Sequence, residues 1–175
     1  PPVSWVGARY RHVLRQVDGS NVMVKISTIP KGARSRCWFG HSNLSNYTIE
    51  ADVKGARTND KMPDIGLIAQ GYALDLQGNS QRLQILSWVP QLRMAKTIDF
   101  SWEPGVWYRL KFQASLVDGT AQLKGKIWPR DEDEPASWTL EATDKSANMQ
   151  GSPGLFGNAK DAQLYLDNIT VTANK

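Results

Sequence analysis

The sequence predicts an all-β protein, a two-sheet antiparallel β-sandwich. Short segments in which apolar and polar residues alternate recur about every 10 residues, as in sandwiches and barrels. Turn residues, mostly Gly, Asn, Asp and Pro, separate these segments. No segment shows the apolar period of an amphipathic helix. We therefore expect roughly ten to twelve strands and one continuous core between two sheets.

The N-terminal third begins with a predicted hairpin. Strands are expected at 10–17 and 22–27, on either side of the turn sequence Asp-Gly-Ser-Asn at 18–21. A loop with Pro30 and Gly32 follows at 29–35, and a short strand at 36–39. Residues 47–54 alternate most regularly, because side chains on a strand point to opposite faces with a period of two. Their inward residues are expected to be Tyr47, Ile49, Ala51 and Val53.

The remaining strands are separated by equally clear turns. After a polar stretch at 55–63, strands are expected at 64–70, 72–77, 81–88, 92–100, 138–143 and 163–172. The segment 151–157 is rich in Gly and Pro around Leu155 and Phe156. The longest element is the hairpin at 107–129, whose Asp118-Gly119 turn is a strong hairpin signal because Gly accepts a positive φ. Its outward face carries Arg109, Lys111, Gln113, Gln122, Lys124, Lys126 and Trp128.

Composition limits the protein class. A chain of 175 residues is expected to form one domain, residues 1–175, with a sizeable core. The net charge of +4 is mild and the two signs are interspersed, so a nucleic-acid partner is not expected. No apolar run reaches membrane-spanning length. Pro1-Pro2 is typical of a stiff linker, so we expect a domain excised from a larger multidomain protein.

The single cysteine, Cys37, excludes an internal disulfide. We expect it to be a small buried hydrophobic residue. His12 and His41 are the only histidines, so a catalytic Cys-His pair is not expected.

The second half of the chain carries a family resemblance. The order WEPGVWYRLKF, LKGKIWPRDEDEPASWTLEATD and SPGLFGNAKDAQLYLDNITV resembles the concanavalin A-like lectin/glucanase jelly roll, in particular laminin-G-like domains of bacterial secreted proteins. The segments GLIAQGYALDL and LQILSWVPQLRMAK extend the match to most of the chain. The combination looks most like the C-terminal domain of pyrroloquinoline-quinone-type β-propeller repeat proteins. The resemblance implies ligands on or beside a concave sheet, an adjacent β-propeller partner, and export to an extracellular or periplasmic location.

The resemblance also raises an enzymatic alternative. Laminarinase-like glycosidases of this fold carry Glu-x-Asp-x-x-Glu or Glu-x-Asp-x-Glu on one strand, with nucleophile and acid about 5 Å apart. Glu50 and Asp52 match the first two positions, but Lys54 and Gly55 stand where the acid belongs. We therefore expect no catalysis, and ion pairs between these carboxylates and neighbouring lysines. A related sugar-hydrolase or lyase group with a similar C-terminal end keeps the enzyme alternative open.

A carbohydrate-binding module needs aromatic platforms for sugar C–H faces and polar groups for hydroxyls. Trp38 lies near the Gly40-His41 loop, and other aromatic candidates lie at strand ends, where the competing interpretation is that they cap the core. The predicted ligand-binding residues are Tyr72, Arg82, Gln84, Trp88, Arg93, Arg109, Lys111, Lys124, Lys126 and Trp128. If three or more of these cations converge on one sheet, we expect a preference for anionic glycans. Otherwise they are dispersed for solubility.

A structural Ca²⁺ site is the one cofactor that the resemblance suggests. Asp167, in LDNITV, resembles a terminal-strand aspartate that joins such sites in related jelly rolls. Calcium takes six to eight oxygen ligands, and the further candidates are Asp18, Asp64, Asp75 and Asp161. The acidic loop at 131–134 is expected to be a solvated spacer. No phosphate loop, nucleophile elbow or zinc spacing is present.

These observations favour a non-catalytic carbohydrate-binding or interaction module of an exported bacterial protein. Two alternatives remain. One is a glycoside hydrolase-like domain that acts on polysaccharide, and the other is a structural domain that docks on a β-propeller.

Overall fold

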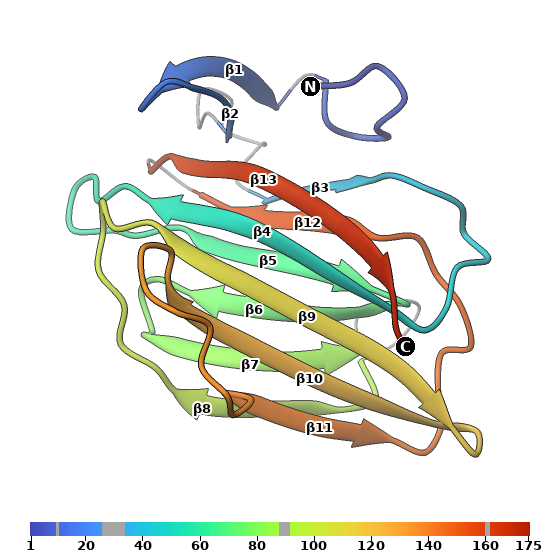
Figure 1. Cartoon of the computed structure of the whole chain (residues 1–175). Helices are drawn as coiled ribbons and strands as arrows, with labels where there is room; N and C mark the ends of the chain where they lie inside the picture. Colours follow the sequence, from blue (N-terminus) through green and yellow to red (C-terminus); the bar gives the residue numbers. More distant parts are fainter. Residues whose placement is uncertain (10, 26–33, 88–91, 160–161) are drawn as a thin grey trace.

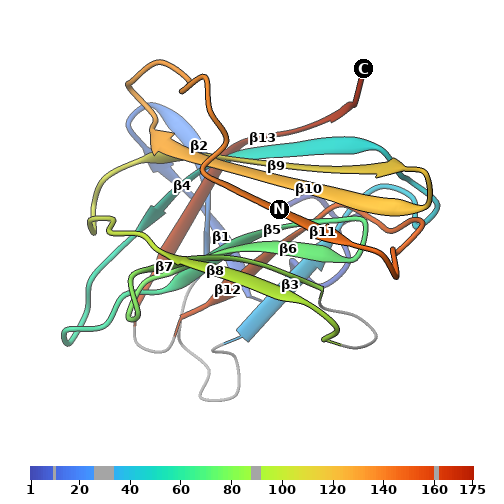
Figure 2. The same ribbon diagram turned by 90° about the horizontal axis from the view of Figure 1, so that it is seen from below.

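The computed structural model describes residues 1–9, 11–25, 34–87, 92–159 and 162–175, which form two stacked antiparallel sheets and no helix (Figures 1 and 2). The seven-stranded sheet has the order β1 (His12–Val17), β2 (Ser20–Lys25), β13 (Leu164–Ala173), β4 (Tyr47–Gly55), β9 (Tyr108–Val117), β10 (Thr120–Pro129) and β11 (Leu140–Asp144). The six-stranded sheet has the order β3 (Arg34–Trp38), β12 (Gly154–Asn158), β5 (Asp64–Ala69), β6 (Tyr72–Gln77), β7 (Arg82–Ser87) and β8 (Ala95–Asp99). The predicted two-sheet antiparallel sandwich is confirmed.

The long hairpin forms as predicted. Val117 of β9 pairs with Thr120 of β10, so Asp118 and Gly119 are the two turn residues. Both have a positive φ, 49° and 75°, which matches the twist that flanking strands require of a two-residue turn. Its two strands lie between β4 and β11 in the seven-stranded sheet (Figure 1).

The core lies between the two sheets. Tyr47, Ile49, Ala51 and Val53 of β4 are all buried there, as their alternation predicts. Residues of β5, β6 and β7 face them from the six-stranded sheet and belong to the same buried cluster, among them Leu67, Leu74 and Ile85. Cys37 is also buried, and burial raises its pKa to about 11, so its thiol is held in the unreactive protonated form.

Two strands at the N-terminal edge begin earlier than expected, and β2 begins at Ser20, inside the predicted turn 18–21. β3 begins at Arg34, inside the predicted loop 29–35, because Arg34 and Ser35 pair with Asn158 and Gly157 of β12. In β2, Met23 joins the main core, while Val22 and Val24 pack in a separate cluster with Trp107. Lys25, the last residue of β2, is fully buried. The predicted strand residues Tyr10, Ile26, Ser27 and Trp88 lie outside the described part of the chain.

In the part of the chain that the structure describes, no helix is long and apolar enough to cross a lipid bilayer.

Candidate functional site

The sandwich has two outer faces, and they differ in how their charged side chains are paired. The front face is the outer surface of the seven-stranded sheet, nearest the viewer in Figure 1. It includes Glu50, Asp52, Arg109, Lys111 and Lys126, which share one side of β4, β9 and β10. The back face is the outer surface of the six-stranded sheet.

Arg109 holds both carboxylates of the partial glycosidase pattern on the front face. Its Nη2 lies 3.1 Å from Glu50 Oε2, and its Nη1 lies 3.1 Å from Asp52 Oδ1. Asn168 Nδ2 also donates to Asp52 Oδ2 at 2.7 Å. The carboxylates are therefore engaged in an ion-pair network, and the third position remains Lys54. The expected cross-strand ion pairs are present, with Arg109 as a partner in addition to Lys111, whose Nζ lies 3.6 Å from Glu50 Oε1.

The acidic loop completes this network instead of acting as a plain spacer. Glu134 Oε1 accepts hydrogen bonds from Lys126 Nζ at 2.8 Å and from Lys111 Nζ at 3.0 Å. These two lysines, Lys126 first, hold the pKa of Glu134 below its usual value. The spacer expectation is wrong for Glu134, because the loop folds back onto β10 and β9. Lys124 lies 3.3 Å from Glu141 of the neighbouring strand β11.

The predicted cations therefore do not form one anion-attracting surface. Lys111, Lys124 and Lys126 share the front face, but each has a carboxylate partner. Arg82 lies on β7 of the other sheet, with its Nε 3.5 Å from Asp99 Oδ1. Arg93 Nη2 donates to Asp144 Oδ2 at 2.8 Å, so this guanidinium also has a carboxylate partner. Pairing of opposite charges removes the basis for an anion preference on the front face.

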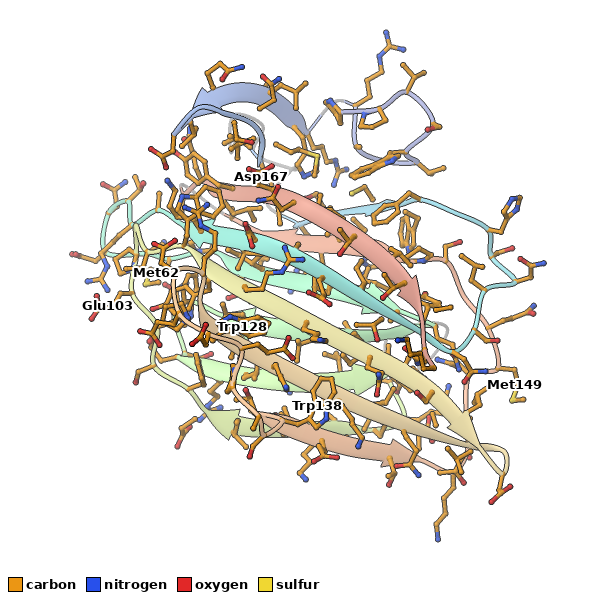
Figure 3. The ribbon with its side chains drawn as sticks, viewed as in Figure 1. Met62, Glu103, Trp128, Trp138, Met149 and Asp167 are labelled. Carbon is orange, nitrogen blue, oxygen red and sulfur yellow. The ribbon has the colours of Figure 1, made fainter. Side chains whose placement is uncertain are left out.

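The predicted aromatic platforms are covered or lie outside the described residues. Tyr72 is 0% exposed, and its hydroxyl donates to Asp144 Oδ2 at 2.8 Å, so a sugar cannot stack on it. Trp128 is 9% exposed on the front face (Figure 3). Trp138, which lies over the same sheet in Figure 3, is half-buried with Lys126 Nζ 4.9 Å from its ring centroid. Trp88 lies outside the described residues.

The back face has a buried carboxyl at its centre, on Asp75. This residue of β6 lies opposite Gly66 of β5 and Gln84 of β7, and it is only 6% exposed. Asp75 Oδ2 accepts a hydrogen bond from Gln77 Nε2 at 3.2 Å, whereas Oδ1 has no hydrogen-bond partner among the described residues. Burial and then the charge of Asp64 raise the pKa of Asp75 to about 7. The group is thus poised to exchange a proton near neutral pH.

Asp64 lies beside Asp75 on the same face, two residues before Gly66 on β5. Its Oδ1 accepts from the Gly78 backbone N–H at 3.0 Å, and its Oδ2 accepts from Asn158 Nδ2 at 3.2 Å. Burial raises the pKa of Asp64 despite these hydrogen bonds. Two carboxyls that are diagonal neighbours on one sheet face are within reach of a shared ligand.

An apolar cluster lies next to these carboxyls. Ile68, Ala73 and Phe156 are buried on the back face, with Trp38 and Leu86 packed against them. Glycines let the aromatic rings lie on the sheet. A Cβ at Gly66 would lie 3.2 Å from Phe156 Cδ1, and one at Gly154 would lie 3.0 Å from Trp38 Cδ1. Trp38 is only half-buried, so its ring is the accessible aromatic surface of this cluster.

A depression of about 450 Å³ opens beside Trp38 at the edge strand β3, and its described lining is Gly7, Arg11, Arg34, Ser35, Arg36 and Trp38. The N-terminal segment forms one wall, since Val6 exchanges backbone hydrogen bonds with Trp38 at 2.9 and 3.0 Å. Sequence reasoning missed its arginines. The signal was present in Arg34-Ser-Arg36-Cys-Trp38, where period two places both cations and the ring on one side, but the predicted loop covered Arg34.

The candidate calcium ligands lie apart. Asp167 of β13 pairs with Asp52 in the seven-stranded sheet (Figure 3), whereas Asp64 and Asp75 lie on the other sheet. Asp18 Oδ2 accepts from Trp107 Nε1 at 3.4 Å, and Asp161 lies outside the described residues. Among the described residues, no three His, Cys, Asp or Glu side chains gather as a metal site. Calcium binding stays a prediction.

The sequence matches no family model and no curated protein, whereas the structure has clear counterparts. A β-1,3-glucanase from Mycobacterium marinum aligns over 98% of this chain and 92% of its own, with 14% identity and a TM-score of 0.61. The metal-free carbohydrate recognition domain of Emp46p aligns over 98% and 89%, with 9% identity and a TM-score of 0.59. Arcelin-5, a lectin-like defense protein from Phaseolus vulgaris, aligns over 96% and 91%, with 6% identity and a TM-score of 0.56. The chain has the concanavalin A-like lectin/glucanase jelly-roll fold.

Proposed function

We propose that this chain is a non-catalytic carbohydrate-binding module and that the back face is its binding site. One observation carries the proposal: a buried carboxyl, Asp75, has an oxygen without a described partner beside an aromatic cluster. A buried acceptor without a hydrogen bond costs free energy, so a ligand that displaces the groups covering Oδ1 and brings a donor to it would recover part of that cost. Sugars supply both hydroxyl donors and apolar C–H faces.

The surrounding polar groups are suited to sugar hydroxyls. Asp64, Gln77, Gln84 and Asn158 are half-buried, so they are reachable and also held in place. Gln84 Nε2 donates to Thr97 Oγ1 at 2.8 Å, and Asn158 is fixed by its bond to Asp64. Carboxylates accept hydrogen bonds and carboxamides both donate and accept, which matches a hydroxyl that does the same. The half-buried ring of Trp38 supplies the platform. The named activities of two counterparts, a glucanase and a carbohydrate recognition domain, support this choice of ligand class.

A second function is favoured by one specific observation. Asp75 has a raised pKa and a neighbouring carboxylate, Asp64, which is the pairing of acid and base that glycosidases use. Glu50 and Asp52 are engaged by Arg109, so the candidate catalytic pair for the enzyme alternative is Asp75 and Asp64 on the back face. Release of reducing sugar from β-glucans, lost in Asp75→Asn, would establish this alternative.

The test of binding is a glycan array followed by calorimetry with the best ligand. We expect Trp38→Ala to weaken binding by about tenfold or more, since truncation of an aromatic hot-spot residue costs about 2 kcal/mol or more and tenfold corresponds to about 1.4 kcal/mol. Trp138→Ala is the matched control, because it removes a half-buried indole from the front face. Binding that is lost in Trp138→Ala and kept in Trp38→Ala would overturn the site. Absence of binding to any glycan would overturn the function and favour the structural-domain alternative.

We also propose that the domain belongs to an exported bacterial protein and adjoins a β-propeller. Both proposals rest on sequence resemblance alone, export on that to laminin-G-like domains of bacterial secreted proteins and the propeller on that to the C-terminal domain of pyrroloquinoline-quinone-type β-propeller repeat proteins. Detection of the native protein in periplasmic or culture fractions tests the first.

A further inference from the structure

The depression at the β3 edge concentrates positive charge. Three of its described lining residues are arginines, Arg11, Arg34 and Arg36, and none is acidic. Burial and then the charge of Arg34 lower the pKa of Arg36. Nη1 of Arg11 donates to the backbone carbonyl of Arg34, which holds the two residues together across the opening. Among the described lining residues the balance of charges is opposite to that of the front face. A carboxyl lies nearby on β5, that of Asp64, whose pKa burial raises and the charge of Arg34 lowers.

A fourth cation lies behind the depression. Lys25 is 0% exposed, and its Nζ has no hydrogen-bond partner among the described residues. Its side chain approaches Ser35 on the core side of β3, because a Cβ placed on Gly157 would lie 3.2 Å from Lys25 Cδ and 3.6 Å from Ser35 Oγ. Ser35 belongs to the lining, and its buried hydroxyl donates to the Gly157 carbonyl at 3.5 Å. Burial and then the charge of Arg11 lower the pKa of Lys25 to about 8, so the ammonium is still mostly charged at neutral pH.

A buried ammonium without a partner among the described residues is costly, and an anion close to it would recover part of that cost. Guanidinium groups match the geometry of carboxylate, sulfate and phosphate oxygens. The ring of Trp38 forms one wall of the depression and also packs on the back-face cluster. A glycan that stacks on this ring could therefore place an acidic group in the depression.

We propose that this depression is an oxyanion site that receives the carboxylate or sulfate group of an acidic glycan through Arg11, Arg34 and Arg36, with Lys25 as a buried charge on the core side of β3. As a glycan subsite it rests on the proposed function, whereas its oxyanion chemistry rests on the depression alone. The preference for anionic glycans that the sequence suggested thus transfers from the front-face lysines to four cations that it did not single out.

The first experiment measures the anion without any sugar. Inorganic sulfate is expected to raise the thermal midpoint of the wild-type protein above that in chloride at matched ionic strength, and to do so much less in Arg34→Gln. Arg82→Gln is the control, because it removes one exposed guanidinium from the same sheet, on β7. Lys25→Met is expected to raise the midpoint in chloride, since an uncompensated charge leaves the core, and to reduce the effect of sulfate. An equal response to sulfate in wild type and Arg34→Gln would overturn the proposal.

The second experiment separates the glycan from a free anion. Calorimetry compares an oligogalacturonate with the same oligosaccharide after methyl esterification, which neutralises every carboxylate. We expect the acid to bind about tenfold or more tightly than the ester, and Arg34→Gln to abolish that difference while Arg82→Gln keeps it. A neutral glycan that binds through Trp38, without a sulfate response, would leave the function standing and overturn the oxyanion site. A sulfate response that depends on Arg34, without any glycan binding, would support the oxyanion site and overturn the proposed function.

Discussion

The two outer faces of the sandwich differ in whether their charged side chains have partners. On the front face, Arg109, Lys111 and Lys126 find carboxylates on neighbouring strands and on the acidic loop. On the back face, Asp75 is more deeply buried than Glu134, yet one of its oxygens has no described partner. The density of charges along a strand is therefore a poor guide to a ligand site. A buried polar group without a partner is a better one, because folded proteins rarely leave such groups unpaired.

The largest expected change in stability comes from breaking the ion-pair network of the front face. Replacement Arg109→Met leaves Glu50 and Asp52 side by side, with Asp52 almost fully buried. Removal of one partner from a buried ion pair costs about 3–5 kcal/mol, and we expect a loss of that size in the free energy of unfolding, measured with urea. The control Arg82→Met breaks an exposed pair and should cost less than about 1 kcal/mol. Equal losses in the two variants would show that the network does not stabilise the fold.

The next largest expected change is the pH dependence of stability that Asp75 causes on the back face. The folded-state pKa of Asp75 is raised to about 7 from an ordinary value of 3.8, so the folded protein binds more protons than the unfolded chain between these limits. Stability therefore falls as pH rises through this window, by up to about 4 kcal/mol. Asp75→Asn should remove this fall and raise the free energy of unfolding at pH 8. Denaturation at pH 5 and pH 8 measures it, with the exposed Asp131→Asn as control. A pH dependence unchanged in Asp75→Asn would refute the assignment.

The smallest expected change in stability distinguishes a paired from a solvated carboxylate within the acidic loop. Glu134→Gln should lower the free energy of unfolding by about 0.5–1 kcal/mol, since Glu134 is partly exposed and its bonds to Lys111 and Lys126 are screened. Added salt should reduce the difference. Glu132→Gln, two residues away and exposed, should have no measurable effect. If the two variants match, the acidic loop is a solvated spacer after all.

Much of the fold was predictable because its signals are local. The alternation of Tyr47, Ile49, Ala51 and Val53 indicates which side of β4 is buried, and Asp118-Gly119 indicates a two-residue turn. Both depend only on neighbours along the chain. The prediction was incomplete at β3, where Arg34 and Ser35 become strand residues only because β12, more than a hundred residues later, pairs with them.

The candidate site was less predictable for the same reason. The sequence places Lys111 and Lys126 on one outward face, and the structure keeps them there. It does not show that Glu134 folds back to neutralise them. Tyr72 was expected at the surface, at a strand end, but its ring enters the core and its hydroxyl meets Asp144 of a distant strand. A strand end is exposed only where no other element covers it.

By itself, the sequence determined the all-β class, most of the strands and turns, and the burial of Cys37, since these follow from residue type and a period of two. Only the tertiary structure decided which charges are neutralised and which are not. Glu50 pairs with Arg109, and Lys25 and Ser35 lie close together on the core side of Gly157. Asp75 lies between Gly66 and Gln84, and one of its oxygens has no partner among the described residues. Electrostatic and hydrogen-bond energies depend on distance in space and on burial, and sheet pairing between remote strands sets both.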